Sequence, residues 1–578
     1  MINPRMFFLH KIAAFFQKVE EYIDTNRKIE ILAILLPVLI FISYFYCIIS
    51  YSVNFPFYDD FNAILVFIQT YNDKHSFPEK FLLLFEQHNE HRIAFDRVVT
   101  LSYYKLFSTI NFKALIFIGN ISLFFIIAIL YRSVLYKNRI NLFYLIPIPL
   151  LVLNHSYYEV SFWAMASLQN MWVLVFAMTS LYFLYQETNY SIYIALFFAV
   201  VATFTSGNGM MTFIAGAIVL GLNKKLFNYK IVLWLLFGVV SIFLYFKGYT
   251  SAADHPSVIK TLFDKPLVLV GFFFTFLGGS FHIVISIIIG LVVLLFCIIV
   301  TFKKYYTTNP VLYSYLLFFL LTAIAVTLGR GGFGIEQATC SRYMINSSVF
   351  MAVCYLVFIS IWNKKMKAYH YFFLLIMSFC FHVYSYDEPL SKQINLKNEF
   401  DRNYSLLAKG VPSNFNFGWP HTDKDKAQRM LIEADKSGIF IFKFVPDSII
   451  VSNFLKKFLP EANEKVEFHI DLLERKKAGE LLIIGWAFLK REKIYNTTFI
   501  VLLRDSTRQN VGFCLPIKMH RSDVNELYKK IDIDNSSHGF IASLETKALK
   551  PGKYKLFLIL TNGETKKEID INKDFIIE

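Results

Sequence analysis

The chain has 578 residues, of which 56% are hydrophobic, 18% aromatic and 17% charged. Because average soluble domains carry roughly 25% charged residues, this composition excludes an ordinary water-soluble globular protein and predicts a polytopic membrane protein. The net charge of +15 does not imply nucleic acid as a partner, because the basic residues collect between apolar blocks, where cytoplasmic loops are expected to hold them.

The first 30 residues predict a cytoplasmic amphipathic helix lying on the membrane surface. Apolar residues recur there at helical spacing, from Phe7 to Ile23, among basic ones. No short apolar core is followed by a small-residue cleavage site, so we expect no signal peptide and a retained first membrane helix.

Eleven apolar stretches follow and predict membrane-spanning helices. They are 31–51, 113–135, 141–154, 168–185, 190–205, 209–223, 230–246, 283–302, 310–328, 345–362 and 368–384. Several are shorter than the roughly 20 residues that cross about 30 Å of hydrocarbon, which predicts broken or re-entrant helices. Successive loops must lie on alternate sides of the membrane, and this holds only if the block 266–282 does not span it. We therefore expect 266–282 to be an interfacial or re-entrant piece.

The distribution of Lys and Arg orients the chain. Residues 1–30 hold five. Two or three lie in each of the loops expected on the same side, near 132–139, 224–230, 303–304 and 363–367. Of the loops expected on the other side, 155–167 and 206–208 hold none and 247–265 holds three. The positive-inside rule therefore predicts a cytoplasmic N-terminus and, with eleven spans, an extracytoplasmic chain after about residue 385.

A polar tail follows the last predicted span. Residues 385–461 contain helix-like patterning at 423–439 and are interpreted as a helical linker region. Residues 462–578 carry short alternating apolar segments, and Asn562-Gly563 between two of them is a hairpin signal. We predict an extracytoplasmic β-sandwich-like domain at 462–578.

The first predicted span leads into Asp59 and Asp60, within a long first outer loop at 52–112. Adjacent carboxylates at a helix mouth can be ordinary solvated loop residues. In a partly dehydrated pocket one of them could instead act as a general base. The pair is also a candidate to bind a divalent cation; the sequence specifies no metal or other cofactor beyond that.

The same loop contains the segment EQHNEHR, which includes Glu90, His91 and Arg92. It does not match HExxH, which argues against a zinc protease. If the segment is helical, His88, His91 and Arg92 share a face and could meet an anionic group or the acidic pair. The alternative is an ordinary amphipathic surface helix.

The segment GRGGFGIEQATCSRY near the outer end of the ninth predicted span contains Arg330, Glu336 and Arg342. Arginines near the membrane are costly and tend to be paired or functional, and a guanidinium binds phosphate in a bidentate way. These arginines are therefore candidate phosphate ligands, with snorkelling to the interface as the alternative. Weaker candidates for sugar contacts on outer loops, which could equally belong to the interfacial aromatic belt, are Glu159, Trp163, Gln169 and Asn208.

Over roughly residues 1–385 the organisation resembles the GT-C superfamily of polytopic glycosyltransferases. The shared features are a cytoplasmic N-terminus, a first helix running into FPFYDDF, a long first outer loop with EQHNEHRIAFDR, and the segments SFWAMASLQN, TSGNGMM and GRGGFGIEQATCSRY. The resemblance implies a bacterial plasma membrane protein whose partners are a polyprenyl-phosphate sugar donor, a glycan or lipid-linked saccharide acceptor, and membrane lipid.

By that resemblance, Asp59 or Asp60 would deprotonate the acceptor hydroxyl, and transfer would invert the anomeric carbon. Phosphate would be bound by Arg330 and Arg342, with Arg92 or His91 helping. The remaining candidates for substrate contacts are Glu90, Glu159, Trp163, Gln169, Asn208 and Glu336. Two alternatives stay open: a transporter of a glycan or lipid-linked intermediate, and a membrane acyltransferase that depends on a histidine of the HNEH segment.

Overall fold

The computed structural model divides the chain into two compact units, one with Met1–Phe400 and Asn416–Ile441, the other with Asp401–Phe415 and Phe442–Glu578. The residues that it describes are 27–135, 140–188, 190–223, 229–250, 258–279, 282–362, 368–408, 424–441, 461, 465–476, 480–489, 498–507, 509–514, 516–519, 524, 538–546, 549–561 and 566–577. The predicted amphipathic helix lies outside them up to residue 26, as does the predicted Asn562-Gly563 turn.

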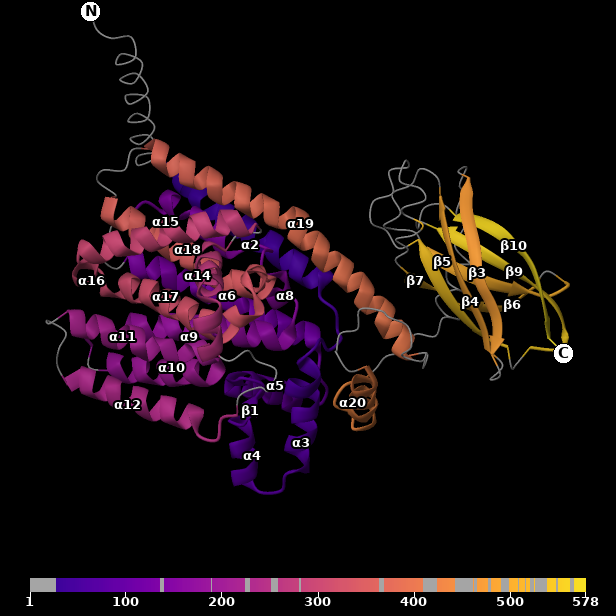
Figure 1. The fold of residues 1–578 in the computed structure, drawn as a ribbon, viewed down its shortest axis with the longest axis horizontal. Coiled ribbons are helices and arrows are strands. Elements are labelled where there is room, and N and C mark those ends of the chain that lie inside the picture. The colour runs from indigo at the N-terminus through magenta and orange to yellow at the C-terminus, as the bar shows by residue number, and fades with distance from the viewer. Residues whose placement is uncertain are drawn as a thin grey trace, which may run out of the picture. The chain divides into compact units, whose positions relative to one another are not determined.

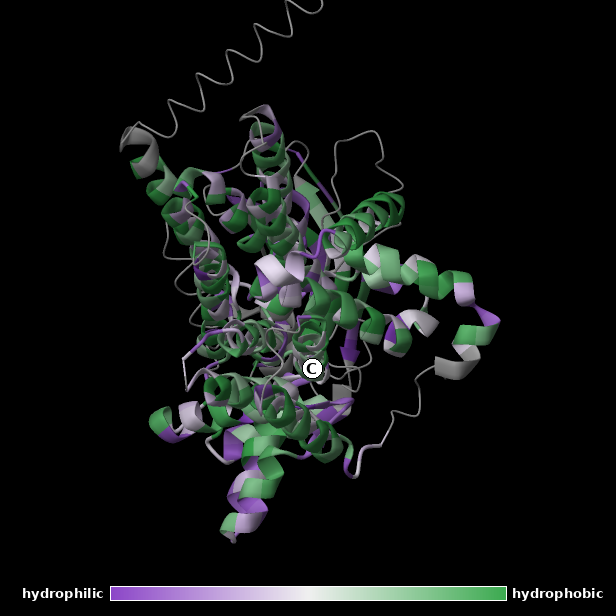
Figure 2. Ribbon diagram, turned by 90° about the vertical axis from the view of Figure 1, so that its left-hand side faces the viewer, coloured by the Kyte–Doolittle hydropathy of each residue, from purple (hydrophilic) through white to green (hydrophobic). Residues whose placement is uncertain are grey.

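The first unit is helical. Within the described residues, seven helices are long and apolar enough to cross a membrane: α2 (Arg27–Tyr51), α6 (Phe112–Leu135), α9 (Ala164–Leu184), α12 (Tyr229–Phe246), α15 (Ile283–Phe302), α17 (Pro310–Arg330) and α18 (Ser341–Trp362). Each coincides with a predicted span, and Figure 2 shows the long helices green, that is hydrophobic, along much of their length. These helices indicate a membrane protein.

The other four predicted spans are shorter apolar helices or part of a longer one. The stretch 141–154 is split into η2 (Leu142–Leu145) and α7, Pro147–Val152, because Pro147 begins a new helix. The next two are α10 (Ser191–Thr205) and the pair η3 (Gly207–Met210) and α11 (Met211–Leu222). The last begins α19 (Ala368–Ala408), which continues far beyond residue 384. The predicted block 266–282 contains α14 (Pro266–Gly278), whose 13 residues are fewer than a straight span needs.

Shorter helices connect these elements. They are α8 (Tyr158–Ser161), α13 (Val258–Asp264), α16 (Tyr305–Thr308), η5 (Gly331–Phe333) and η6 (Ile335–Thr339).

Small side chains let the helices approach closely, as is common where helices pack in a membrane. A Cβ on Gly119 of α6 would lie 2.1 Å from Ser167 Oγ of α9, so only glycine fits there. Buried polar groups are paired in the same region. Tyr44 of α2 donates to Asn120 Oδ1 at 2.7 Å, and Asn120 Nδ2 donates to the Ser161 carbonyl at 2.7 Å.

The predicted first outer loop is folded at one end of these helices (Figure 1). Its elements are η1 (Phe61–Val66, a π-helix), α3 (Phe67–Asp73), α4 (Phe77–Leu84), β1 (Gln87–His88), β2 (His91–Arg92) and α5 (Ala94–Phe107). Ser76 and Glu79 form a capping box that starts α4. The helix α20 (Lys424–Lys436) lies beside η1, and the chain after it is anchored where Ile110 N–H donates to the Ile439 carbonyl at 2.7 Å.

The second unit is strand-rich and consists of two four-stranded antiparallel sheets, as the alternating pattern predicts. One has the order β10 (Lys566–Ile577), β9 (Gly552–Thr561), β5 (Thr498–Arg504), β6 (Asn510–Cys514), and the other β3 (Val466–Lys476), β4 (Glu480–Leu489), β8 (Gly539–Glu545), β7 (Ile517–Met519). One hydrophobic core joins them, with Leu481 and Phe540 from one sheet and Val501 and Leu556 from the other. Such sharing of a core between two sheets is the organisation of a β-sandwich.

Candidate functional site

A cavity of about 490 Å³ lies in the helical unit, and the residues around it come from distant parts of the sequence. Eight predicted site residues line it: Asp59, Glu90, His91, Trp163, Gln169, Asn208, Arg330 and Arg342. The lining comes from the C-terminal ends of α12 and α17, the N-terminal ends of α9 and α18, and the segments that follow α2 and α10. Since the chain leaves some helices and enters others there, these ends gather at one side of the bundle.

The two adjacent carboxylates have different surroundings. Asp59 lines the cavity with its side chain 35% exposed, and Oδ1 accepts a hydrogen bond from Asn89 Nδ2 at 3.1 Å. Asp60 is buried at 1% exposure and is not part of the lining. Its oxygens accept the N–H groups of Phe57 at 3.0 Å and Met165 at 2.9 Å. Asp60 therefore ties the loop after α2 to the N-terminus of α9.

Burial raises the pKa of Asp60 to about 7, and the N–H groups of Met165 and Phe57 oppose this rise by stabilising the carboxylate. The backbone beside it is unusual. Tyr58 has a φ of 42°, and the chain then enters the π-helix η1. Both features recur at functional sites, where surrounding contacts hold a less favourable backbone in place. Here they turn Asp59 toward the cavity and Asp60 away from it.

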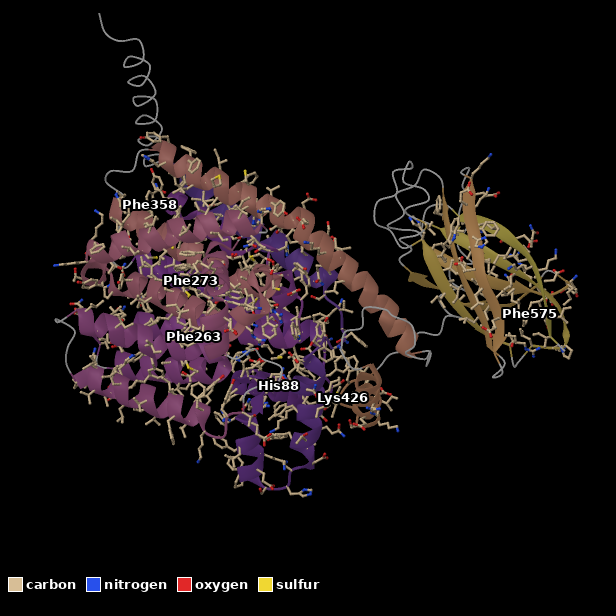
Figure 3. The ribbon with its side chains drawn as sticks, viewed as in Figure 1. His88, Phe263, Phe273, Phe358, Lys426 and Phe575 are labelled. Atoms are coloured by element: carbon tan, nitrogen blue, oxygen red, sulfur yellow. The ribbon has the colours of Figure 1, made fainter. Side chains whose placement is uncertain are left out.

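The segment 86–92 is a short hairpin and not a helix, so the shared helical face of His88, His91 and Arg92 does not exist. Asn89 makes the turn with a φ of 48°, a conformation that Asn tolerates better than most residues. His88 and His91 are directly paired across the two strands. Figure 3 labels His88, which lies where the predicted outer loop meets the ends of the bundle helices.

Arg92 fastens this hairpin to the end of α12. Its guanidinium donates to the carbonyls of Tyr245 and Lys247, each at 2.6 Å, and to that of Phe85. Gln87 adds a second tie, since its amide donates to the Thr250 carbonyl at 2.7 Å and accepts from the Thr250 N–H at 3.0 Å. Arg92 is outside the cavity lining. Because its guanidinium donates to three carbonyls, Arg92 holds the hairpin in place, and the structure does not bring it to the cavity with the other two predicted phosphate ligands.

His91 is oriented by a backbone contact. Its Nδ1 accepts the N–H of Gly207 at 3.3 Å, so the ring proton of the neutral form lies on Nε2. Burial lowers the pKa of His91 to about 4. A Cβ on Gly207 would lie 3.2 Å from Nδ1, so a glycine there leaves room for this approach. His91 is thus a neutral hydrogen-bond donor near neutral pH.

The two predicted phosphate ligands lie near different carboxylates. Arg330 Nη2 lies 3.0 Å from Glu90 Oε2, which joins the end of α17 to the hairpin. Burial raises the pKa of Glu159, and the positive charge and backbone N–H of Arg342 oppose that rise. Glu159 therefore lies beside Arg342 but outside the cavity lining. Glu336, in η6, is exposed and is likewise outside it.

Several lining residues were not predicted from the sequence. Asn89 belongs to the EQHNEHR segment, of which only the neighbouring His88, Glu90, His91 and Arg92 were singled out, and it would have been found by extending that motif to all its polar members. Asn346 follows Arg342 by one helical turn on α18, so helical spacing could have found it. Thr322, on α17, gave no sequence signal because it stands in an apolar run.

The acidic pair does not fit a divalent cation, because Asp60 spends its oxygens on backbone N–H groups and only Asp59 faces the cavity. Among the described residues, no group of three or more His, Cys, Asp or Glu side chains is arranged to hold a metal ion. We therefore assign no reaction step to a metal.

Comparison of the chain with protein-family models, curated proteins and solved structures finds no match. The assignment of a function consequently depends on the chemistry of the cavity.

Proposed function

We propose that this chain is a GT-C-type glycosyltransferase that moves a sugar from a polyprenyl-phosphate donor to a surface glycan or lipid-linked acceptor. The proposal includes an eleven-span topology, a cytoplasmic N-terminus and a cavity on the extracytoplasmic face of a bacterial plasma membrane. The observation that carries it is the convergence of Asp59, Arg330 and Arg342 on one cavity at one end of apolar helices. A carboxylate and two guanidinium groups are what transfer from a phosphate leaving group requires.

In the proposed reaction, the acceptor hydroxyl attacks the anomeric carbon of the donor. A bond forms between the acceptor oxygen and that carbon, the bond from the carbon to the phosphate oxygen breaks, and the hydroxyl proton passes to the Asp59 carboxylate. Polyprenyl phosphate leaves with the electron pair. Arg330 and Arg342 stabilise its growing negative charge, an effect that typically changes rates by about 10²–10³ per donor removed.

The other lining residues have supporting roles in this proposal. Glu90 orients Arg330 through the 3.0 Å ion pair. Trp163 packs edge-on against Phe57 at 5.2 Å between ring centres and is a rigid aromatic wall against which a sugar ring can stack. His91 donates a hydrogen bond without carrying charge. A cavity of about 490 Å³ lies within the range of about 300–1,000 Å³ typical of small-ligand sites.

Two observations weigh against the alternatives. A histidine-dependent acyltransferase needs a basic imidazole, whereas burial lowers the pKa of His91 to about 4 and its Nδ1 accepts the Gly207 N–H. A transporter is expected to carry charged residues in the middle of the membrane, along the pathway of its substrate. The charged lining residues here all come from loops and helix ends on one side of the bundle.

The test is the composition of surface glycans, measured by mass spectrometry in cells with the native chain, a deletion, Asp59→Asn, Arg342→Ala or Glu336→Gln. We expect the deletion, D59N and R342A to lose the same glycan component. E336Q is the matched control, because Glu336 is a predicted site residue outside the cavity, and it should retain that component. A deletion without effect contradicts the proposed function, whereas native profiles in D59N and R342A contradict the assigned roles only.

A further inference from the structure

Two side-chain oxygens of the cavity wall have no hydrogen-bond partner among the described residues. They are Oγ1 of Thr322 and Oδ1 of Asn346, whose residues are 0% and 7% exposed. Both residues line the cavity. A buried polar atom without a partner costs about 1–3 kcal/mol, and in native structures such atoms are usually completed by water or a ligand.

Both residues lie deeper in the bundle than the arginines. Thr322 comes eight residues before Arg330 on α17, which places it about 12 Å further along the helix axis. Asn346 comes four residues after Arg342 on α18, about 6 Å further along. Each displacement runs from the helix end into the bundle. We call the part of the cavity beside Thr322 and Asn346 its floor, and the part beside Arg330 and Arg342 its mouth.

Charge separates the two parts. The ionisable residues of the lining, such as Asp59, Arg330 and Arg342, come from helix ends and loops. The lining residues further along helices α9 and α17 are uncharged: Gln169, Asn170, Thr322, Ala325 and Val326. Gln169 keeps its amide in place by donating to Ser206 Oγ at 3.3 Å. The floor therefore combines polar and apolar side chains and carries no charge.

We propose that this floor is a binding site for the uncharged, hydroxyl-bearing ring of a sugar, contacted by Thr322, Asn346 and Gln169, while the phosphate stays at the arginines. The assignment rests on the proposed function, since it places the donor sugar of that reaction. A sugar hydroxyl both donates and accepts hydrogen bonds, so it can complete an amide oxygen and a threonine hydroxyl together. A prenyl chain would leave both atoms unpaired, and a phosphate would find no cation there.

Thr322→Val tests this directly, because valine keeps the shape of threonine and removes only the hydroxyl. Without ligand, T322V should unfold at the same temperature as the native chain or higher, since the lost hydroxyl had no partner. The hydroxyl-retaining control is Thr322→Ser. Thermal unfolding of the purified chain in detergent is then followed with separate probes: inorganic phosphate, glucose, galactose and N-acetylglucosamine.

We expect phosphate to raise the unfolding temperature of the native chain, T322S and T322V equally. At least one sugar should raise it for the native chain and T322S, with that shift lost in T322V. The proposal is overturned if no sugar stabilises the native chain, if T322V keeps the sugar shift, or if T322V destabilises the ligand-free chain. A sugar shift that depends on Thr322 in a chain whose deletion leaves surface glycans unchanged would support the sugar site and refute the transferase.

A second inference comes from the surface of α4 and does not depend on the reaction. Phe77, Phe81 and Leu82 are 79%, 49% and 65% exposed on this short helix. Figure 1 shows α3 and α4 projecting from the cavity end of the bundle, crosswise to α12, with α4 on the side of α12. The outer side of α12 is apolar as well, with Phe243 at 67% exposure.

We infer that α4 is embedded in the headgroup region of the bilayer that the bundle crosses, as a continuation of the lipid-facing surface of α12. Helices that lie in this region bury their apolar face about 5–10 Å into the boundary with the acyl chains. A row of rings leads inward from α4. Phe81, Phe85, Phe204 and Tyr245 follow one another at 5.3, 5.5 and 6.3 Å between centres, and Tyr245 lines the cavity.

The test is tryptophan fluorescence of the full chain in lipid nanodiscs, with the native emission subtracted. Phe81→Trp should be quenched by lipids brominated near the headgroup more than by lipids brominated near the chain end. Asn72→Trp, at an exposed position of α3, is the matched control and should respond to aqueous acrylamide instead. F81W emission quenched by acrylamide alone would place α4 in water, and emission shielded from both quenchers would indicate a protein partner; either result overturns the inference.

Discussion

Replacing Asp60 by Asn should remove part of the pH dependence of the unfolding free energy. Asp60 is buried and accepts two backbone N–H groups, from Phe57 and Met165. An Asn side chain has one oxygen, so one of these N–H groups loses its acceptor. That loss costs about 1–3 kcal/mol of unfolding free energy at every pH.

The ionisation of Asp60 adds a term that changes with pH. Burial raises its pKa from 3.8 to about 7, so between these values the folded chain holds a proton that the unfolded chain has released. Stability therefore falls as pH rises through this window. At about 1.36 kcal/mol per pH unit, the raised pKa corresponds to a decrease of about 4 kcal/mol between pH 4 and pH 8. D60N lacks this decrease.

The measurement is the unfolding free energy by chemical denaturation in detergent micelles, at several pH values, for the native chain, D60N and Asp59→Asn. D60N should be less stable than the native chain near pH 4 and should gain on it by about 4 kcal/mol toward pH 8. D59N is the isosteric control. It removes only the repulsion from Asp59, a smaller cause of the raised pKa of Asp60 than burial, so it should keep most of the decrease that the native chain shows. A difference between D60N and the native chain that stays constant with pH would refute the reasoning from burial.

Three further outcomes are expected. His91→Gln should remove a loss of stability that the native chain shows as pH falls from about 6.5 to 4, because burial lowers the pKa of His91 to about 4 and its charging opposes folding; the same denaturation series measures it, and an unchanged acid limb would contradict it. Gly209→Ala should abolish folded protein in size-exclusion chromatography, since its Cβ would lie 1.9 Å from the Ala202 carbonyl oxygen, whereas Gly221→Ala meets no atom within 4 Å and should fold. Leu556→Ala should cost the strand-rich unit about 2–5 kcal/mol, as for fully buried leucines generally, while the partly exposed Leu472→Ala should cost clearly less; equal losses would contradict the core assignment.

Hydropathy and periodicity predicted the helices because both depend on local composition. The seven long helices coincide with predicted spans, and the strand pattern of the tail became two sheets. Hydropathy predicts the ends of helices less well. Pro147 divides one predicted span into two helices, and α19 continues past residue 384, where the apolar run ends and polar residues follow in the same helix.

At the candidate site, too, the sequence predicted some features and not others. The residue types were visible in the sequence, since carboxylates, arginines and aromatic residues gather in the segments between apolar blocks. Their roles were not, because they depend on which backbone groups come near in space. Asp60 meets the N–H of Met165, and Arg92 meets the carbonyls at the end of α12. Neither contact leaves a trace in sequence spacing.

By itself, then, the sequence determined that the chain is a membrane protein with a strand-rich tail, since burial of apolar side chains follows local pattern. Only the tertiary structure decided which of two adjacent carboxylates faces the cavity, and that Thr322 lies beside it. The physical reason is that a buried polar group is defined by its partners, and partners more than a hundred residues away are brought together only by the packing of helices.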